Sequence, residues 1–231
     1  MTSMRRTSTR RRDDGVIVVL ALFLTLLLSA LGAALALMTS SEAAIAQNFK
    51  NGYEALHAAD AAAERALADL DALTDWTPTL TGAIRSTFVD GPASGTRRLP
   101  DGTTLDLAQV VNLANCRKKT MCSVSEIETV TSDRPWAANN PRWQLFLSGP
   151  LRDISPGRVI DSSLYVVVLV ADDPSETDGD PLLDSDPPQS GSHTVLLRAL
   201  AFGPRGTQRT IELTVTRSGT SHVRVIAWRP Y

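Results

Sequence analysis

The sequence lacks the residue patterns on which most enzyme chemistry depends. It has only two cysteines and three histidines, and no cysteine lies near a histidine along the chain. It has no Gly-x-Ser-x-Gly motif, in which a strained turn exposes a catalytic serine, and no glycine-rich loop that would bind a phosphate. These absences predict that the protein is not an enzyme.

The chain also lacks a large net charge. Its formal charge is −2 at pH 7, so it has no overall excess of positive charge to attract a polyanion. We therefore exclude nucleic acid as the partner of the main domain. The basic residues that do cluster are confined to the first part of the chain, and they are Arg5, Arg6, Arg10, Arg11 and Arg12.

Residues 16–38 (VIVVLALFLTLLLSALGAALALM) contain no ionisable side chain. At about 1.5 Å per residue, a helix of this length crosses a hydrocarbon layer of roughly 30 Å. Its hydroxyl side chains, Thr25 and Ser29, can bond to a carbonyl one turn earlier. We therefore expect a membrane helix at 16–38. Because the arginines precede it and Glu42 is the first charge after it, the positive-inside rule predicts a cytoplasmic N-terminus and an exported C-terminal part.

Proline is absent before Pro78, and a helical pattern continues past the apolar stretch. The single Gly52 costs about 1 kcal/mol without ending a helix. We therefore predict one helix over residues 16–74, with its membrane-spanning half at 16–38. The outer half has an apolar stripe that a sheet from the same chain would cover. The stripe consists of Ile45, Phe49, Tyr53, Leu56, Ala59, Ala63, Leu67, Leu70 and Leu73.

The C-terminal part of the sequence predicts that sheet. Strands are expected at residues 143–148, 164–171, 193–202, 209–217 and 223–228. Ile211, Leu213 and Val215 alternate with polar residues, so we expect one face of their strand to be buried. The segment 164–171 is so uniformly apolar that it is expected inside the sheet.

These elements predict an α+β fold in which a long N-terminal helix packs on a C-terminal antiparallel sheet. The expected organisation is a leader without a fold of its own at 1–15, the helix at 16–74, an irregular region at 75–142 and the sheet domain at 143–231. Turn signals fill most of the irregular region, and one short helix is expected at 105–113.

Two groups of residues could carry chemistry in the exported part. Cys116 and Cys122 enclose RKKTM and predict a disulfide loop. Two unpaired thiols remain an alternative, and zinc is disfavoured because no histidine lies nearby. An acidic loop would either be solvated or bind calcium through oxygen ligands, although its spacing is not that of an EF-hand. Its acids are Asp172, Asp173, Glu176, Asp178, Asp180, Asp184 and Asp186.

Two further features of the sequence each allow two interpretations. Trp228 and Tyr231, near the end of the chain, would either form a contact surface or pack against the sheet. The small residues Ala34 and Ala36 around Leu35 form a cleavage site of the kind that follows a secretory signal peptide. In that case the apolar segment would be removed, whereas a cut after Gly15 would retain it.

The N-terminal residues resemble the N-terminal domain of PilX-type minor pilins, which are type IV pilus assembly proteins. The resemblance covers Gly15 before the apolar run, TSSEAAIAQNF at 39–49 and YEALHAADAAAERAL at 53–67. It implies a pilin-like fold, cleavage after Gly15 by a prepilin peptidase and methylation of Val16. It also implies an inner-membrane protein with a periplasmic domain, whose partners are other minor pilins and the pilus assembly machinery and which enters a surface pilus.

The chain differs from major pilins at several positions. Asp13 and Asp14 precede Gly15 where a basic residue is usual, and Val16 replaces a phenylalanine. Leu20 lies at the fifth mature position, where major pilins have a glutamate. Because an unpaired carboxylate in an apolar fibre core costs several kcal/mol, its absence suits a subunit that primes or caps the fibre tip.

Two other functions fit the same sequence. K-type minor pseudopilins of type II secretion also lack this glutamate, bind calcium and cap a fibre, but they carry a large helical insertion. Residues 76–142 have too little helical periodicity to form one. The other alternative is a single-pass envelope protein that binds a ligand or partner through a periplasmic domain.

Overall fold

The computed structural model describes residues 10–155, 157, 160–176, 179–184, 193–217 and 222–231. The chain forms two compact units, Met1–Phe49 and Lys50–Tyr231. Helix α1, Arg10–Asp71, contributes residues to both units. It begins before the predicted start at residue 16, so the expectation that all of 1–15 lacks a fold is wrong for 10–15. Arginine is a good helix former, and one glycine costs only about 1 kcal/mol, so Gly15 does not set the boundary.

The first unit exposes a continuous apolar surface. All residues of 16–38 are exposed, including Val16 at 67% and Phe23 at 69%. The segment Gly15–Asp71 is long and apolar enough to cross a membrane by length and composition. Thr25 Oγ1 donates to the carbonyl of Leu22 at 2.9 Å, as expected for a hydroxyl in an apolar helix.

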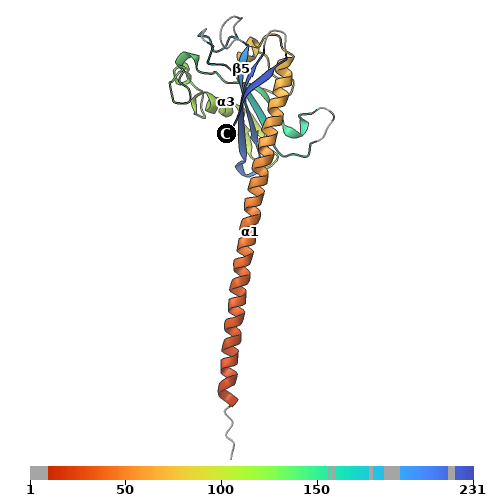
Figure 1. The fold of residues 1–231 in the computed structure, drawn as a ribbon, viewed down its shortest axis with the longest axis vertical. Coiled ribbons are helices and arrows are strands. Elements are labelled where there is room, and N and C mark those ends of the chain that lie inside the picture. The colour runs from red at the N-terminus through yellow and green to blue at the C-terminus, as the bar shows by residue number, and fades with distance from the viewer. Residues whose placement is uncertain (1–9, 156, 158–159, 177–178, 185–192, 218–221) are drawn as a thin grey trace, which may run out of the picture. The chain divides into compact units, whose positions relative to one another are not determined.

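In the second unit, α1 packs on a sheet through a face made mostly of alanines. These residues have 0–1% of their surface exposed, and they are Ala55, Ala58, Ala59, Ala62, Ala63, Ala66 and Leu70. The helix therefore contributes mainly small side chains to this core, and the strands contribute larger ones. Figure 1 shows this orange end of α1 beside strand β5.

The predicted apolar stripe is therefore only partly correct. Ala59, Ala63 and Leu70 are buried, and three of its leucines, Leu56, Leu67 and Leu73, are partly buried. The stripe's bulky residues nearer the N-terminus are exposed, namely Ile45 at 66%, Phe49 at 74% and Tyr53 at 57%. The large residues predicted the wrong centre for the contact face, because four buried residues of that face lie outside the stripe, namely Ala55, Ala58, Ala62 and Ala66.

The second unit contains a five-stranded antiparallel sheet in the order β3-β4-β5-β6-β7. Its strands are β3 Gln144–Pro150, β4 Tyr165–Asp172, β5 Thr194–Phe202, β6 Gln208–Thr216 and β7 Arg224–Pro230. Each overlaps a predicted strand. The structure thus confirms the coarse α+β layout of a long helix and an antiparallel sheet. The prediction that the apolar segment 164–171 lies inside the sheet is also confirmed, since β4 pairs with β3 and β5.

Both faces of β4 are covered, which explains its uniform apolar sequence. Val166, Val168 and Val170 belong to the core under α1. The alternate residues Val167 and Leu169 belong to a second core on the other face, with residues from 75–142. By contrast, β6 buries only Ile211, Leu213 and Val215, as its alternating sequence predicts.

Residues 75–142 are more regular than predicted. They form helices α2 Thr77–Leu80, α3 Leu107–Cys116 and α4 Val124–Ile127, the 3-10 helix η1 Ala137–Asn139, and a two-stranded sheet of β1 Thr96–Arg98 and β2 Thr104–Asp106. Helix α3 confirms the short helix expected at 105–113. It begins where the Asp106 carboxylate accepts the N–H groups of Ala108 and Gln109, an N-cap that satisfies otherwise unpaired donors. The remaining short helices are η2 Leu151–Asp153 and η3 Pro204–Gly206.

Candidate functional site

The N-terminal residues singled out from the sequence lie on one continuous helix. Gly15, Val16 and Leu20 all belong to α1, and a Cβ added at Gly15 would meet no atom within 4 Å. Leu20 is 70% exposed. At this position the chain presents a hydrocarbon side chain, which can pack against another apolar helix and cannot pair with an amine.

Cys116 and Cys122 form a disulfide, with their Cα atoms 6.0 Å apart. The bond joins the last residue of α3 to the segment before α4. The loop also contains Arg117 and Lys118, which form ion pairs with Asp133 and Glu126 outside it. The hydrogen bond from Lys118 lowers the pKa of Glu126 to about 2. The pairing excludes two unpaired thiols and a zinc site, and it gives these cysteines a structural role.

The acidic loop is only partly described, because Asp178 and Asp186 lie outside the described residues. The carboxylate of Asp173 accepts the Ser175 hydroxyl at 2.6 Å, and that of Asp180 accepts the Leu182 N–H at 3.1 Å. Such bonds are typical of turns.

Three acids of this loop are buried, so the prediction of a solvated loop is wrong for these three. Asp172 is 1% exposed, Glu176 0% and Asp184 9%. Burial raises the pKa of Asp184, while its bond from the His193 N–H at 2.7 Å opposes that shift. Across the described part of the chain, no three His, Cys, Asp or Glu residues gather so that they could hold a metal ion.

A groove of about 1040 Å³ lies on the face of the sheet opposite α1. Helix α3 and residues 132–136 form one wall, and β5, β6 and β7 form the other. The described lining contains neither histidine nor cysteine. This groove was not predicted from the sequence.

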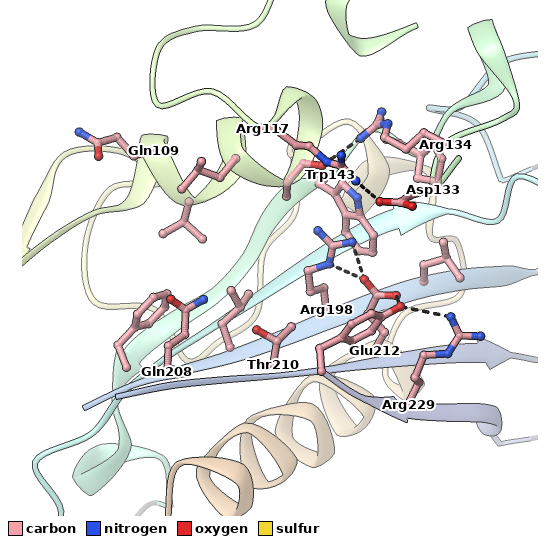
Figure 2. Close-up of a pocket in the computed structure, with 18 of the residues that line it drawn as sticks. Gln109, Arg117, Asp133, Arg134, Trp143, Arg198, Gln208, Thr210, Glu212 and Arg229 are labelled. Atoms are coloured by element: carbon pink, nitrogen blue, oxygen red, sulfur yellow. Dashed lines mark hydrogen bonds and ion pairs between the residues drawn. The ribbon is translucent and has the colours of Figure 1, made fainter. Parts of the chain in front are cut away.

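A row of paired polar side chains crosses the floor of the groove (Figure 2). The Arg198 guanidinium lies 4.4 Å from the centre of the Trp143 ring, and its Nε donates to Glu212 at 2.6 Å. The Tyr231 hydroxyl donates to the other Glu212 oxygen at 2.9 Å, and it accepts a bond from Arg229 at 3.2 Å. Both oxygens of Glu212 are therefore bonded, and the row forms a connected polar surface on the floor of the groove.

Arg134 fixes the wall of the groove that helix α3 and residues 132–136 form. Its guanidinium donates to the carbonyls of Ala114, Ile127 and Pro141 at 2.9, 3.1 and 3.0 Å. Burial, followed by the charges of Arg198 and Arg117, lowers the pKa of Arg134 to about 10, so it is still protonated at pH 7. One wall of the groove therefore contains a protonated guanidinium that is bonded to three carbonyls, and the floor contains the Arg198–Glu212 ion pair.

Replacing Glu212 with alanine is expected to reduce the free energy of unfolding by about 1–2 kcal/mol. Its carboxylate and the Arg198 guanidinium are about one-quarter exposed, between the limits of surface and fully buried ion pairs. Urea denaturation of the full chain in detergent micelles would measure the loss. The matched control is Glu54→Ala, which breaks the exposed pair with Lys50 and should cost less than about 0.5 kcal/mol. Equal losses of unfolding free energy in the two variants would show that the Arg198–Glu212 pair is no better protected from solvent than the Lys50–Glu54 pair.

One signal in the sequence could have revealed part of this site. The turn at Gly203–Gly206 predicts the hairpin of β5 and β6, and counting outward from it places Arg198 opposite Glu212, as observed. The partners Trp143 and Tyr231 lie just outside β3 and β7, so no local pattern connects them to this pair. No family model, curated protein or solved structure matches the chain.

Proposed function

We propose that this protein is a non-enzymatic, minor pilin-like subunit that takes part in type IV pilus assembly, priming or capping the fibre tip. The observation that carries the proposal is the construction of α1. The same helix has an uncharged, exposed apolar segment at 16–38 and a C-terminal part that packs on an antiparallel sheet through alanines. A pilin subunit needs both parts, one for the membrane or fibre core and one for the exported domain.

The exposed apolar surface supports an assembly role. In the inner membrane, with the N-terminus cytoplasmic and the sheet domain periplasmic, lipid would cover Val16 to Met38. In a fibre, helices of other minor pilins would cover the same side chains. Lipid and neighbouring apolar helices are similar environments for hydrocarbon, so the exchange has a small net cost. Such an exchange allows an assembly motor to extract the subunit.

Leu20 supports a position at or near the tip. A glutamate in an apolar fibre core needs a cation nearby, because an unpaired buried carboxylate costs several kcal/mol. Leu20 has no such requirement, so this subunit can enter the fibre without a neighbour above it that supplies an amine. After cleavage, Val16 would be the methylated first residue.

The pilus is favoured over type II secretion by the region between helix and sheet. The helices α2, α3 and α4 of residues 75–142 have 4, 10 and 4 residues. None forms the large helical insertion that K-type pseudopilins carry. The groove of about 1040 Å³ favours a second candidate function, a single-pass envelope protein that binds a ligand through its periplasmic domain.

Sequencing the mature N-terminus tests the proposal. The full chain is expressed with its cognate prepilin peptidase, and the membrane and sheared-fibre fractions are collected. A chain that begins at Val16 and occurs in the fibres is expected. Gly15→Leu should block cleavage, while the matched variant Gly32→Leu, at another open helical glycine, should be processed normally.

The alternative functions give different results. A chain that begins at Leu37 would be an ordinary secreted domain. A chain that retains its arginines, stays in the membrane and is absent from fibres would be the envelope protein. Either result would reject the pilin proposal.

A further inference from the structure

The two edges of the five-stranded sheet differ in how they are covered. At β3, the N–H groups of Ser86 and Asp90 donate to the carbonyls of Phe146 and Ser148 at 2.9 and 2.8 Å, and Val89 forms a bridge with Ser148. At the opposite edge, within the part of the chain that the structure describes, no backbone group bonds to β7 except from the β6 side. An uncovered edge is a template for another strand.

Strand β7 is exposed along its whole length and carries large apolar side chains. Val225 is 43% exposed, Ile226 58% and Trp228 49%. Val225 and Trp228 lie opposite Val215 and Leu213, which are buried in the core under α1. Paired residues share a face, so these two side chains extend the apolar surface of the core outward to the free edge.

The backbone register shows which groups face outward. The Tyr231 N–H donates to the Thr210 carbonyl at 2.8 Å, so bonds to β6 alternate back from Tyr231 through Arg229. The N–H and C=O of Trp228 therefore face away from β6. Pro230 also lies at an outward position and has no N–H, which sets one end of the surface available to an added strand.

The charge of β7 indicates what would bind there. Arg224 and Arg229 flank the apolar residues, and the strand has no carboxylate. Two copies pairing through β7 would bring four arginines together while the paired strands themselves contribute no acid, which is unfavourable for like charges across strands. A strand with carboxylates at its ends would instead place opposite charges beside both arginines.

We propose that β7 is a docking edge for an extended segment of another protein, which has apolar side chains at alternate positions and carboxylates flanking them. The segment adds to the sheet as a further strand beside β7. Main-chain bonds to Trp228 supply part of the affinity, contact with Val225 and Trp228 supplies more, and the arginines select acidic ends. The inference depends on the sheet alone, so it holds whether or not the protein is a pilus subunit.

Binding of synthetic strands to the full chain in detergent micelles tests the inference. The probe is an end-blocked, fluorescent peptide of alternating valine and threonine with glutamates at both ends. We expect saturable binding by anisotropy, at least about 10-fold tighter than for the same peptide with lysine ends, which is about 1.4 kcal/mol. A version with prolines in its central positions should not bind, because it cannot form the main-chain bonds.

Variants of β7 separate main-chain from side-chain recognition. Trp228→Pro removes an outward N–H and should abolish binding, whereas Trp228→Ala keeps that N–H and should weaken binding less. Arg224→Glu keeps the strand but leaves one positive and one negative end, so it should remove most of the preference for acidic over basic ends, which gives a test even if Trp228→Pro does not fold. The inference is wrong if wild-type protein shows no preference for acidic ends or if Arg224→Glu leaves the preference unchanged. It is also wrong if a peptide of residues 223–231 binds more tightly, since that would indicate self-association.

Discussion

Replacing Trp76 with alanine is expected to lower the free energy of unfolding of the second unit by about 3–5 kcal/mol, the usual cost of deleting a large buried aromatic. Trp76 is 1% exposed and belongs to the core under α1. Its indole N–H donates to the Leu70 carbonyl at 3.1 Å, and the Arg217 guanidinium lies 4.9 Å from the ring centre. The variant would therefore lose buried surface, a hydrogen bond and a cation–π contact together.

The position of Trp76 at the end of α1 adds to this effect. The last carbonyls of a helix have no partner within the helix. Here Arg217 donates to the carbonyls of Leu70, Asp71 and Leu73, and Trp76 packs against that guanidinium. Without the ring, Arg217 is less constrained and the helix end loses part of its cap.

Urea denaturation of the full chain in micelles would measure the change, with the circular dichroism of the sheet as the signal. Trp136→Ala is the matched control, because Trp136 is 42% exposed and should cost less than about 1 kcal/mol. Similar losses in the two variants would contradict the packing described for Trp76.

The elements that the sequence predicted well are those with a local hydrophobic signal. Residues 16–38 and 164–171 have uninterrupted apolar sequences, and β6 alternates strictly, so their type could be assigned without knowledge of their neighbours. The burial of the other face of the sheet, opposite α1, could not be predicted in this way. It depends on Leu107 and Val110 of α3 reaching Val167 and Leu169 of β4, a long-range contact that no spacing along the chain encodes.

The contact face of α1 was difficult to predict for another reason. Alanine contributes little to a hydrophobic pattern, so the large residues Phe49 and Tyr53 dominated the predicted stripe although both are exposed. What identifies the true face is its burial in one cluster with residues of β4 and β5, which no spacing within the helix encodes. The groove likewise combines residues of α3, β5, β6 and β7 that lie far apart along the chain, and only its Arg198–Glu212 pair, within the β5–β6 hairpin, could be inferred.

Replacing Ala62 with leucine is expected to lower the free energy of unfolding by about 1–3 kcal/mol, because extra methylene and methyl groups would enter a packed core. Ala62 has 0% of its surface exposed and lies in the cluster that joins α1 to the sheet. Ala and Leu have similar helix propensities, so the change tests packing and not helix formation. Denaturation under the conditions used for Trp76 would measure it.

The neighbouring residue provides a matched control for this variant. Ala61 is exposed on the same helix, one position away, so Ala61→Leu should change the free energy of unfolding by less than about 0.5 kcal/mol. The apolar segment at 16–38 is unchanged in both variants, so both should insert into membranes equally. If the proposed pilus function is correct, Ala62→Leu should also lower the amount of the subunit in sheared fibres, since a displaced sheet changes the surface that neighbouring subunits meet. Equal stability of the two variants would show that α1 does not approach the sheet as closely as its alanine face indicates.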